Sequence, residues 1–255
     1  MDTLLYVENL HVSFEGFLAL HNLNLILEPQ ERIRLLIGPN GAGKTTLFDA
    51  LTGQVEPVMG RVLFKDHVNL LGLSEHVIAH HGVIRKFQTP SVFPDHTVYE
   101  NMVLSSGSKH FLASFAARAA SHEQEQIAEV LEQVGLLDHA NELAGTLSHG
   151  QKQWLEIAML LVQSPTLLLL DEPVAGMTRA EKDRTVALID GIVKRSACSI
   201  MLIEHDMQFV RQIAGRGHKV TVLHEGTVLS EGSIDHVQAD ERVIEAYLGR
   251  GKVSA

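Results

Sequence analysis

Short apolar segments separated by turns make up about the first seventy residues of the chain. Four of them have the length and composition of β-strands: Leu4–Val7, Leu23–Leu27, Ile33–Ile37 and Arg61–Phe64. The third segment is apolar except for Arg34, which is typical of a strand buried on both faces. It ends in a glycine-rich turn, and a helical pattern starts at Thr45. The pattern therefore predicts a strand, a loop and a helix in succession.

The hydrophobic period lengthens in the middle of the chain, from about Phe87 to Leu161. One helix is predicted from apolar residues spaced i, i+3, i+4 and i+7, namely Ile127, Val130, Leu131 and Val134. Gly135 directly after this stripe is a helix-stop signal. A second predicted helix follows Gly150 and ends before Pro165. The middle of the chain is therefore predicted to be mainly helical.

Strand signals return in the last third of the chain. Predicted strands are Thr166–Leu170, Ser199–Ile203 and Lys219–Leu223, with a predicted helix at Ala180–Lys194 between the first two. Alternating strands and helices indicate a mostly parallel sheet with helices on both faces. We interpret the helical middle, residues 88–161, as a subdomain inserted into an α/β core made of residues 1–87 and 162–255.

Composition limits the possible partners. The 255 residues include 21 basic and 31 acidic ones, for a net charge of −10, so we expect no nucleic-acid partner. The single cysteine, Cys198, lies in an apolar run and fits a core position in a reducing compartment. The N-terminal segment carries Asp2 and Glu8 without a basic cluster, and no apolar run is long enough to span a bilayer. We therefore expect neither a signal peptide nor a membrane span.

The glycine-rich turn matches the phosphate-loop pattern G-x-x-x-x-G-K-[ST]. Its residues are Gly38, Pro39, Asn40, Gly41, Ala42, Gly43, Lys44 and Thr45, followed by Thr46. Glycines allow backbone N–H groups to turn toward a phosphate, and the N-terminus of the following helix adds its positive dipole end. Lys44 is expected to reach the β- and γ-phosphates, and the Thr45 hydroxyl is expected to coordinate Mg²⁺. The sequence thus predicts a nucleoside triphosphate site.

Two adjacent acids follow an apolar strand in the run Leu167–Leu170, Asp171, Glu172. A buried strand that ends in two carboxylates can direct the first, Asp171, toward Mg²⁺. The second, Glu172, can orient and deprotonate an attacking water. Together with the phosphate loop, this pair predicts an ATP hydrolase.

The segment Leu147-Ser148-His149-Gly150-Gln151 stands before a predicted helix, 20 residues ahead of Asp171. It resembles LSGGQ, the signature motif of ABC ATPases, with His149 at the usual first glycine. The resemblance implies that Ser148, Gly150 and Gln151 contact the nucleotide held by a second cassette, with the serine hydroxyl and backbone N–H groups on its γ-phosphate. A serine cap on a helix is also expected from Ser148 alone.

Further family landmarks occur in the expected order. By resemblance, Gln88 is the Q-loop glutamine that reaches the metal and the water, His205 is the switch histidine at the γ-phosphate, and Phe14 stacks on adenine. The alternatives are a core position at a strand edge for Phe14 and a capping or surface role for His205. Thr178 stands where the family's D-loop usually has aspartate, which weakens an expected contact with the partner cassette.

The resemblance covers about residues 4–249 and implies a RecA-like core, an antiparallel β-subdomain and the inserted helical subdomain. It implies ATP and Mg²⁺ as cofactors, and a second cassette and membrane permease subunits as partners. It also implies a cytoplasmic location, peripheral on the membrane through the permease. Residues 85–90, 147–157, 172–178 and 246–249 resemble importer ATPases for urea and branched-chain amino acids, and urea importers most closely.

The sequence favours this family over three alternatives and over a metal site. An ABC ATPase acting on DNA or ribosomes would carry a coiled-coil insertion or a second cassette, which the sequence does not indicate. A small-molecule kinase has no use for the 147–151 motif. An exporter half usually has fused membrane helices, and no apolar run here is long enough for one. His76 and His80, at i, i+4 spacing beside His81, could suit a metal, but a solvated helix face explains them better.

Overall fold

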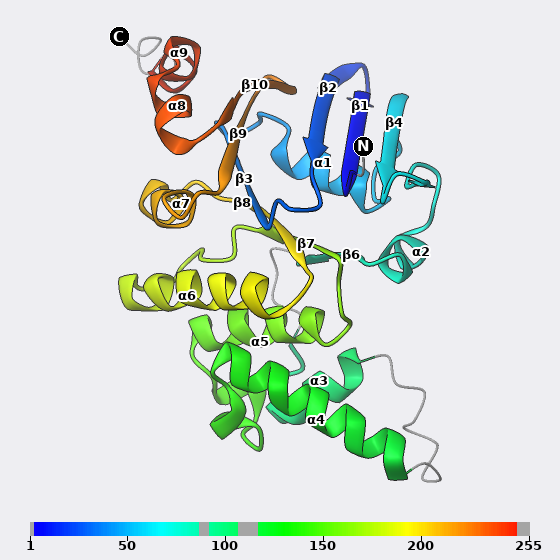
Figure 1. Ribbon diagram of the computed structural model, residues 1–255, viewed down its shortest axis with the longest axis vertical. Helices are drawn as coiled ribbons and strands as arrows, with labels where there is room; N and C mark the ends of the chain where they lie inside the picture. The colour runs from blue at the N-terminus through cyan, green and yellow to red at the C-terminus, as the bar shows by residue number, and fades with distance from the viewer. Residues whose placement is uncertain (1–2, 87–91, 107–116, 249–255) are drawn as a thin grey trace. The chain divides into compact units, whose positions relative to one another are not determined.

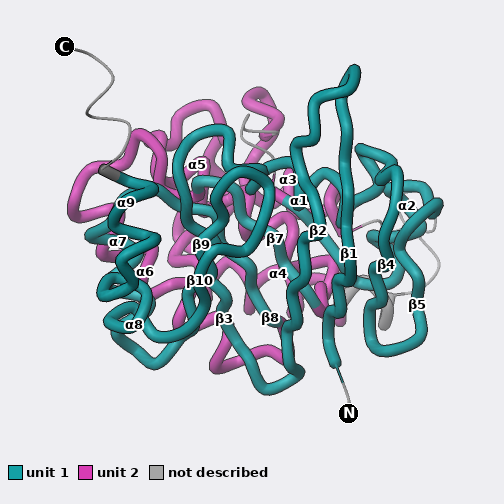
Figure 2. Tube along the Cα trace, turned by 90° about the horizontal axis from the view of Figure 1, so that it is seen from above, with its two compact units in different colours: residues 1–85, 167–172, 199–255 teal, residues 86–166, 173–198 magenta. Residues whose placement is uncertain are grey.

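The computed structural model describes residues 3–86, 92–106 and 117–248 (Figure 1). The chain divides into two compact units. Unit 1 contains residues 1–85, 167–172 and 199–255, and unit 2 contains residues 86–166 and 173–198 (Figure 2). Each unit is therefore assembled from segments that lie far apart in the sequence.

Unit 1 contains a four-stranded antiparallel sheet in the order β2-β1-β4-β5. The strands are β1 (Leu5–Phe14), β2 (Phe17–Leu27), β4 (Met59–Phe64) and β5 (Val68–Asn69). Alternate residues of β1, among them Leu5 and Val7, are buried, as expected for a sheet with one face on the core. The register shifts after Val7, where Asn9 has a positive φ of 47°. The bulge brings Leu10 back to the buried face.

The second sheet has six strands in the order β10-β9-β3-β8-β7-β6. They are β3 (Ile33–Ile37), β6 (Val83–Lys86), β7 (Leu167–Asp171), β8 (Ser199–Ile203), β9 (Lys219–His224) and β10 (Thr227–Gly232). β3 pairs in parallel with β8 and β9, and β7 pairs in parallel with β8, whereas β10 returns antiparallel to β9. Every residue of β3, β7 and β8 is buried, which explains their nearly unbroken apolar sequences.

Arg34 is the charged exception within β3, and its side chain is fully buried. It forms ion pairs with Glu31 and Glu231 at 2.5 and 2.6 Å and donates a hydrogen bond to the hydroxyl of Thr221 at 2.9 Å. A buried charge is tolerated only when it is paired and hydrogen-bonded in this way.

The helices of unit 1 are α1 (Lys44–Leu51), α2 (Glu75–His80), α7 (Met207–Ala214), α8 (Ile234–Ala239) and α9 (Glu241–Leu248). In Figure 1, α1 follows β3, and α8 and α9 lie near β9 and β10. The Asp206 carboxylate caps α7 by accepting from the backbone N–H groups of Gln208 and Phe209.

Unit 2 is helical, with α3 (Val98–Ser105), α4 (Ala117–Val134), α5 (His149–Leu161) and α6 (Arg179–Arg195). Its core joins α5 to α6, because the Trp154 indole N–H donates to the hydroxyl of Thr185 at 2.9 Å. A buried ion pair of 3.1 Å links Lys86 to Glu156 of α5. Three of the predicted stripe residues, Ile127, Leu131 and Val134, are buried.

The structure departs from the predicted strands at the N-terminal hairpin. β1 and β2 form one long hairpin over residues 5–27, of which the sequence analysis predicted only the ends, because the bulges at Asn9 and Asn22 interrupt the two-residue alternation. α6 belongs to the helical unit although it follows β7 in the sequence. The predicted bounds of the inserted subdomain stay a prediction. No helix of the described residues is both long and apolar enough to cross a membrane.

Candidate nucleotide site

The loop between β3 and α1 has a backbone that only glycine can supply. Gly43, the residue before α1, has φ +94°. A Cβ there would lie 2.6 Å from Leu20 Cδ2 and 2.8 Å from the Ala19 carbonyl oxygen. Gly43 is therefore needed both for its conformation and for the close approach of β2.

The N-terminus of α1 is prepared for an anion. Its cap makes no side-chain hydrogen bond, and its first turn contains no acidic residue. Gly43 therefore offers no side-chain acceptor to the backbone N–H groups of the first turn, which carry the positive end of the helix dipole. Of the predicted ligands here, Thr45 is exposed and Thr46 is half-buried.

The side chain of Lys44 folds back onto the loop that precedes it. Its Nζ donates to the carbonyl oxygens of Gly38 at 2.8 Å and Pro39 at 3.0 Å, and the residue is only 9% exposed. Asn40 and Gly41 lie on the exposed side of the loop. The ammonium is thus held beside the loop by carbonyl groups, where a phosphate oxygen would offer it a stronger, charge-assisted bond.

Asp171 and Glu172 end β7 in different environments. Asp171 is 1% exposed, whereas the side chain of Glu172 is 34% exposed. Glu172 has a positive φ of 48°, which is uncommon for a residue with a side chain. Its backbone N–H donates to the Ile203 carbonyl oxygen at 2.9 Å, so β8 holds the strained residue in place.

The candidate base and the candidate switch residue are neighbours. His205 Nδ1 lies 3.3 Å from Glu172 Oε1, and the histidine side chain is 63% exposed. His205 follows β8 just as Glu172 follows β7, so the parallel pairing of the two strands brings these residues to the same edge of the sheet. An exposed imidazole beside a half-exposed carboxylate can contact a ligand and water together.

Arg85, for which the sequence predicted no role, joins three parts of the site. Its guanidinium forms ion pairs with Asp49 of α1 at 2.5 Å and with Asp171 Oδ2 at 3.1 Å, and it lies 5.6 Å from the centre of the Phe48 ring. Arg85 is the last residue of unit 1 before the segment that contains Gln88. The sequence signal was weak: a basic residue beside Lys86 in a four-residue strand that begins with two apolar residues. Its partners could not be predicted because they lie 36 and 86 residues away.

The carboxyl of Asp171 fits a hard cation. Arg85 occupies Oδ2, whereas the buried Oδ1 has no partner of normal hydrogen-bond geometry among the described residues. Burial raises the pKa of Asp171, and the charge of Glu172 adds to this; Arg85 and the Thr45 hydroxyl oppose it without cancelling it. An orphaned carboxylate oxygen near a threonine hydroxyl offers the oxygen ligands that Mg²⁺ prefers.

Replacing Asp171 with asparagine tests how much the burial of its charge destabilises the fold. Because the folded-state pKa is raised, Asp171 adds stability below the pKa of the unfolded chain, and this contribution is lost as the pH rises through the folded-state pKa. We expect the variant without nucleotide to become more stable relative to wild type as the pH is raised from about 4, near the ordinary carboxyl pKa, to about 8. Denaturant unfolding at several pH values measures this difference.

Added Mg²⁺ and ATP should make wild type more stable than the Asp171→Asn variant. Ligand at about 100 times its dissociation constant stabilises a folded protein by about 2.7 kcal/mol, and the Asp171→Asn variant should lose most of this gain. A variant whose stability relative to wild type falls as the pH is raised would contradict the raised pKa, and one that Mg²⁺ and ATP still protect as well as wild type would contradict the proposed metal contact.

The signature segment lies in unit 2 and opens α5. The Ser148 hydroxyl accepts from the Gln151 backbone N–H at 3.2 Å, and the Gln151 side chain accepts from the Ser148 backbone N–H at 2.9 Å. This capping box confirms the expected serine cap. His149 Nε2 lies 3.0 Å from the Ala175 carbonyl oxygen, so the side chain that replaces glycine contacts the neighbouring loop.

The sequence also predicts Phe14 and Gln88 as ligands of the nucleotide site. Phe14 is 44% exposed and pairs across the hairpin with Phe17, which is 69% exposed, so aromatic rings are available for stacking at the hairpin end. Gln88 lies outside the described residues, and its role as metal and water ligand stays a prediction. The histidines 76, 80 and 81 form no metal cluster with other ligating residues in the described part of the chain.

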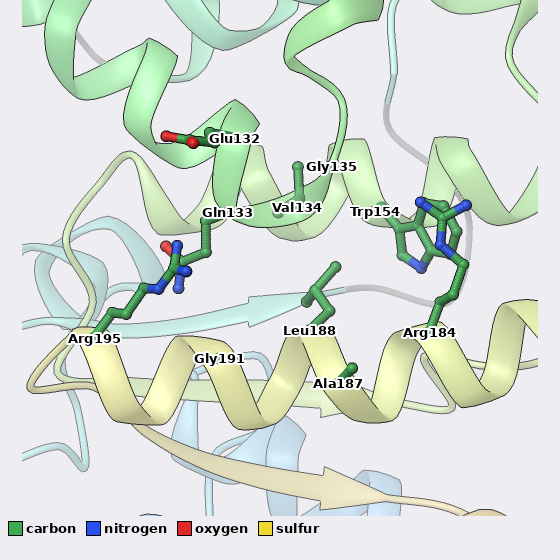
Figure 3. A pocket seen from close by; sticks show the side chains of 10 residues that line it. All are labelled: Glu132, Gln133, Val134, Gly135, Trp154, Arg184, Ala187, Leu188, Gly191 and Arg195. Atoms are coloured by element: carbon green, nitrogen blue, oxygen red, sulfur yellow. The ribbon is translucent and has the colours of Figure 1, made fainter.

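A groove in unit 2 is separate from these residues. It has a volume of about 270 Å³ and lies between the C-terminal part of α4 and one face of α6 (Figure 3). Arg184 lies over the Trp154 ring, 4.6 Å from its centre, and Arg195 lies at the other end of the groove. None of the predicted nucleotide ligands lines it.

Comparison with known proteins agrees with the geometry of the site. Residues 20–175 match the family described as "ABC transporter", and residues 227–253 match "Branched-chain amino acid ATP-binding cassette transporter". The high-affinity branched-chain amino acid transport ATP-binding protein LivG of Escherichia coli (strain K12) is 40% identical over 254 residues, covering 96% of this chain and 98% of LivG. The corresponding protein BraF of Pseudomonas aeruginosa is 37% identical over 255 residues, with 96% and 98% coverage.

Solved structures show the same architecture. A nucleotide-free ATP-binding cassette from an ABC transporter superimposes with a TM-score of 0.81 at 26% identity, covering 97% of this chain and 99% of the other. The ADP conformation of an ABC transporter cassette gives a TM-score of 0.82 at 27% identity, with 98% and 99% coverage. The predicted fold class is confirmed. With its phosphate loop, paired carboxylates and signature segment, this chain belongs to the ABC transporter ATP-binding family and is an ATPase that binds ATP and uses Mg²⁺.

Proposed function

We propose that this cassette powers a membrane importer of the branched-chain amino acid class. The observation that carries the proposal is similarity over nearly the full length to LivG and BraF, joined by the match of residues 227–253 to a branched-chain amino acid cassette family. These relatives favour the branched-chain amino acid alternative over the urea importer that the sequence motifs suggested.

The site residues receive separate roles in this proposal. Lys44 and the loop of residues 38–46 bind the phosphates, and the exposed ring of Phe14 stacks on adenine. Thr45 and Asp171 hold Mg²⁺, which neutralises charge on the β- and γ-phosphates when bound. Glu172 orients and deprotonates the water. His205, next to Glu172, contacts the γ-phosphate.

The proposed nucleotide site is composite and includes a second cassette. The phosphate loop and the carboxylates belong to unit 1, whereas Ser148, Gly150 and Gln151 belong to unit 2. In the proposed arrangement, two cassettes bind two ATP molecules, with the signature of one cassette facing the phosphate loop of the other. Permease subunits would place the pair at the cytoplasmic face of the membrane and use its closure and opening for transport.

Urea is the second candidate solute, and one observation favours it. The segments 147–157 and 174–178 resemble urea importer ATPases more than amino acid ones. Within the first segment, Glu156 forms the buried pair with Lys86, and His149 contacts the Ala175 carbonyl oxygen. The solute never touches the cassette, so the chemistry of the nucleotide site favours neither candidate.

Uptake by a strain that lacks this gene separates the two solutes. We expect uptake of labelled leucine to fall and uptake of labelled urea to stay normal. Both solutes are supplied at micromolar concentration, on the order of the lowest KM values of enzymes. A plasmid copy should restore uptake, and a Glu172→Gln copy should not, because it allows assembly without powered transport. Lost urea uptake with normal leucine uptake would move the assignment to urea. Normal uptake of both would reject both solutes.

A further inference from the structure

The carboxylate of Glu181, in the first turn of α6, has two sets of contacts. Oε2 accepts from the backbone N–H of Thr178 at 2.9 Å and from its hydroxyl at 2.8 Å, which completes the capping box of α6. Oε1 lies 3.4 Å from the hydroxyl of Ser148, at the start of α5. All three residues belong to unit 2. The carboxylate therefore caps one helix and contacts the N-terminus of another.

The second set of contacts includes Gly150. The backbone N–H of Gly150 and the Ser148 hydroxyl both contribute to lowering the pKa of Glu181, after the larger contributions of Thr178. A Cβ on Gly150 would lie 2.4 Å from Glu181 Oε1 and 2.7 Å from its carboxyl carbon. The carboxylate is therefore packed directly against Gly150, and no larger residue fits there unless Glu181 moves.

These contacts place the Glu181 carboxylate, an anion, at the N-terminus of α5, where anions bind favourably. Backbone N–H groups and a hydroxyl at a helix N-terminus attract negative charge, and here the negative charge comes from the same chain. We propose that the Glu181 carboxylate occupies the anion-binding end of α5, made by Ser148 and Gly150, and competes there with the γ-phosphate of ATP. This proposal rests on the proposed function, in which the signature segment receives the phosphate.

The Glu181 carboxylate and the γ-phosphate compete because both are negatively charged and both need the same hydrogen-bond donors. A carboxylate and a phosphate at the same helix end repel each other, and the repulsion is strong where water is excluded. They also compete for one hydroxyl and one N–H group. Glu181 would have to swing away from Ser148 and Gly150, keeping its bonds to Thr178, before a second cassette could close. Glu181 thus sets how much ATP is needed for closure and acts as a positioning residue.

The chain offers a matched control in Glu100. It completes the capping box of α3 with Thr97, accepting from the backbone N–H at 2.7 Å and from the hydroxyl at 3.1 Å, and these bonds lower its pKa as well. Its hydrogen bonds among the described residues go to Thr97 and not to the signature segment. Glu100 therefore repeats the capping role of Glu181 without the contact to α5.

The decisive variant is Glu181→Gln, with Glu100→Gln as its control. Glutamine can complete a capping box, so helix capping is kept and only the negative charge is removed. We expect the ATP concentration for half-maximal hydrolysis to fall roughly 3- to 10-fold for Glu181→Gln, within the range that one charge-assisted contact provides. Glu100→Gln should match wild type. The difference should shrink at high salt, which screens the repulsion. An unchanged or raised ATP requirement in Glu181→Gln would overturn the proposal.

A second measurement does not depend on hydrolysis. Inorganic phosphate at millimolar concentration should raise the Tm of Glu181→Ala more than that of wild type or Glu100→Ala, because only the first variant frees the end of α5. Equal shifts in all three proteins would overturn the proposal. If wild type hydrolyses no ATP while the phosphate shifts still differ, the proposed function fails and the competition at α5 stands.

Discussion

Replacing Glu172 with glutamine should slow ATP hydrolysis by a factor of roughly 10² to 10⁴ while leaving ATP binding intact, the usual contribution of a positioned general base. The side chain keeps its size and its hydrogen-bonding capacity, so the substitution removes the basic carboxylate and little else. The strained φ of 48° is held by the bond from the Glu172 N–H to Ile203 and should not change. An ATP-bound dimer should accumulate because closure is no longer followed by hydrolysis.

Glu225 provides the control for this substitution. It is an exposed glutamate with nearly the same positive φ, 47°, in unit 1. Glu225→Gln should therefore show any effect of the amide on a strained position without affecting the water. Phosphate release assays and size-exclusion chromatography with ATP and Mg²⁺ measure turnover and dimerisation. Normal turnover in Glu172→Gln would assign the base to another residue.

Replacing Lys44 with alanine should abolish measurable ATPase activity and weaken ATP binding by roughly 10- to 100-fold. A hydrogen bond to a charged group contributes about 1.5–3 kcal/mol, and no other residue of the loop carries a positive charge. The rate should fall further than the affinity, because charge grows on the transferred phosphoryl oxygens in the transition state. Binding of a fluorescent ATP analogue and steady-state turnover separate the two effects.

The Lys44→Ala protein should remain folded. Its ammonium donates to the carbonyl oxygens of Gly38 and Pro39 in the same loop, and the core beside α1 is formed by other residues such as Leu47 and Phe48. Lys194→Ala, at an exposed position on α6, serves as the control lysine. An unfolded Lys44→Ala protein, or one with wild-type turnover, would contradict the role given to Lys44.

The sequence by itself determined the elements whose signals are local. The phosphate loop, the strand that ends in Asp171 and Glu172, and the serine cap at Ser148 each depend on residues a few positions apart. Backbone conformation and short-range hydrogen bonding are decided at that distance. The apolar runs of β3, β7 and β8 also identified a buried parallel sheet, since only strands covered on both faces lack polar alternation.

Tertiary structure alone decided which distant residues share a site. Arg85 could be recognised as part of it only when β6, α1 and β7 were assembled, because its partners Asp49 and Asp171 lie far along the chain. The contact of Glu181 with Ser148 and Gly150 likewise depends on how α6 packs beside α5, because these residues lie about 30 positions apart in the sequence. Long-range charge pairing depends on how elements pack, and no local pattern encodes the partner.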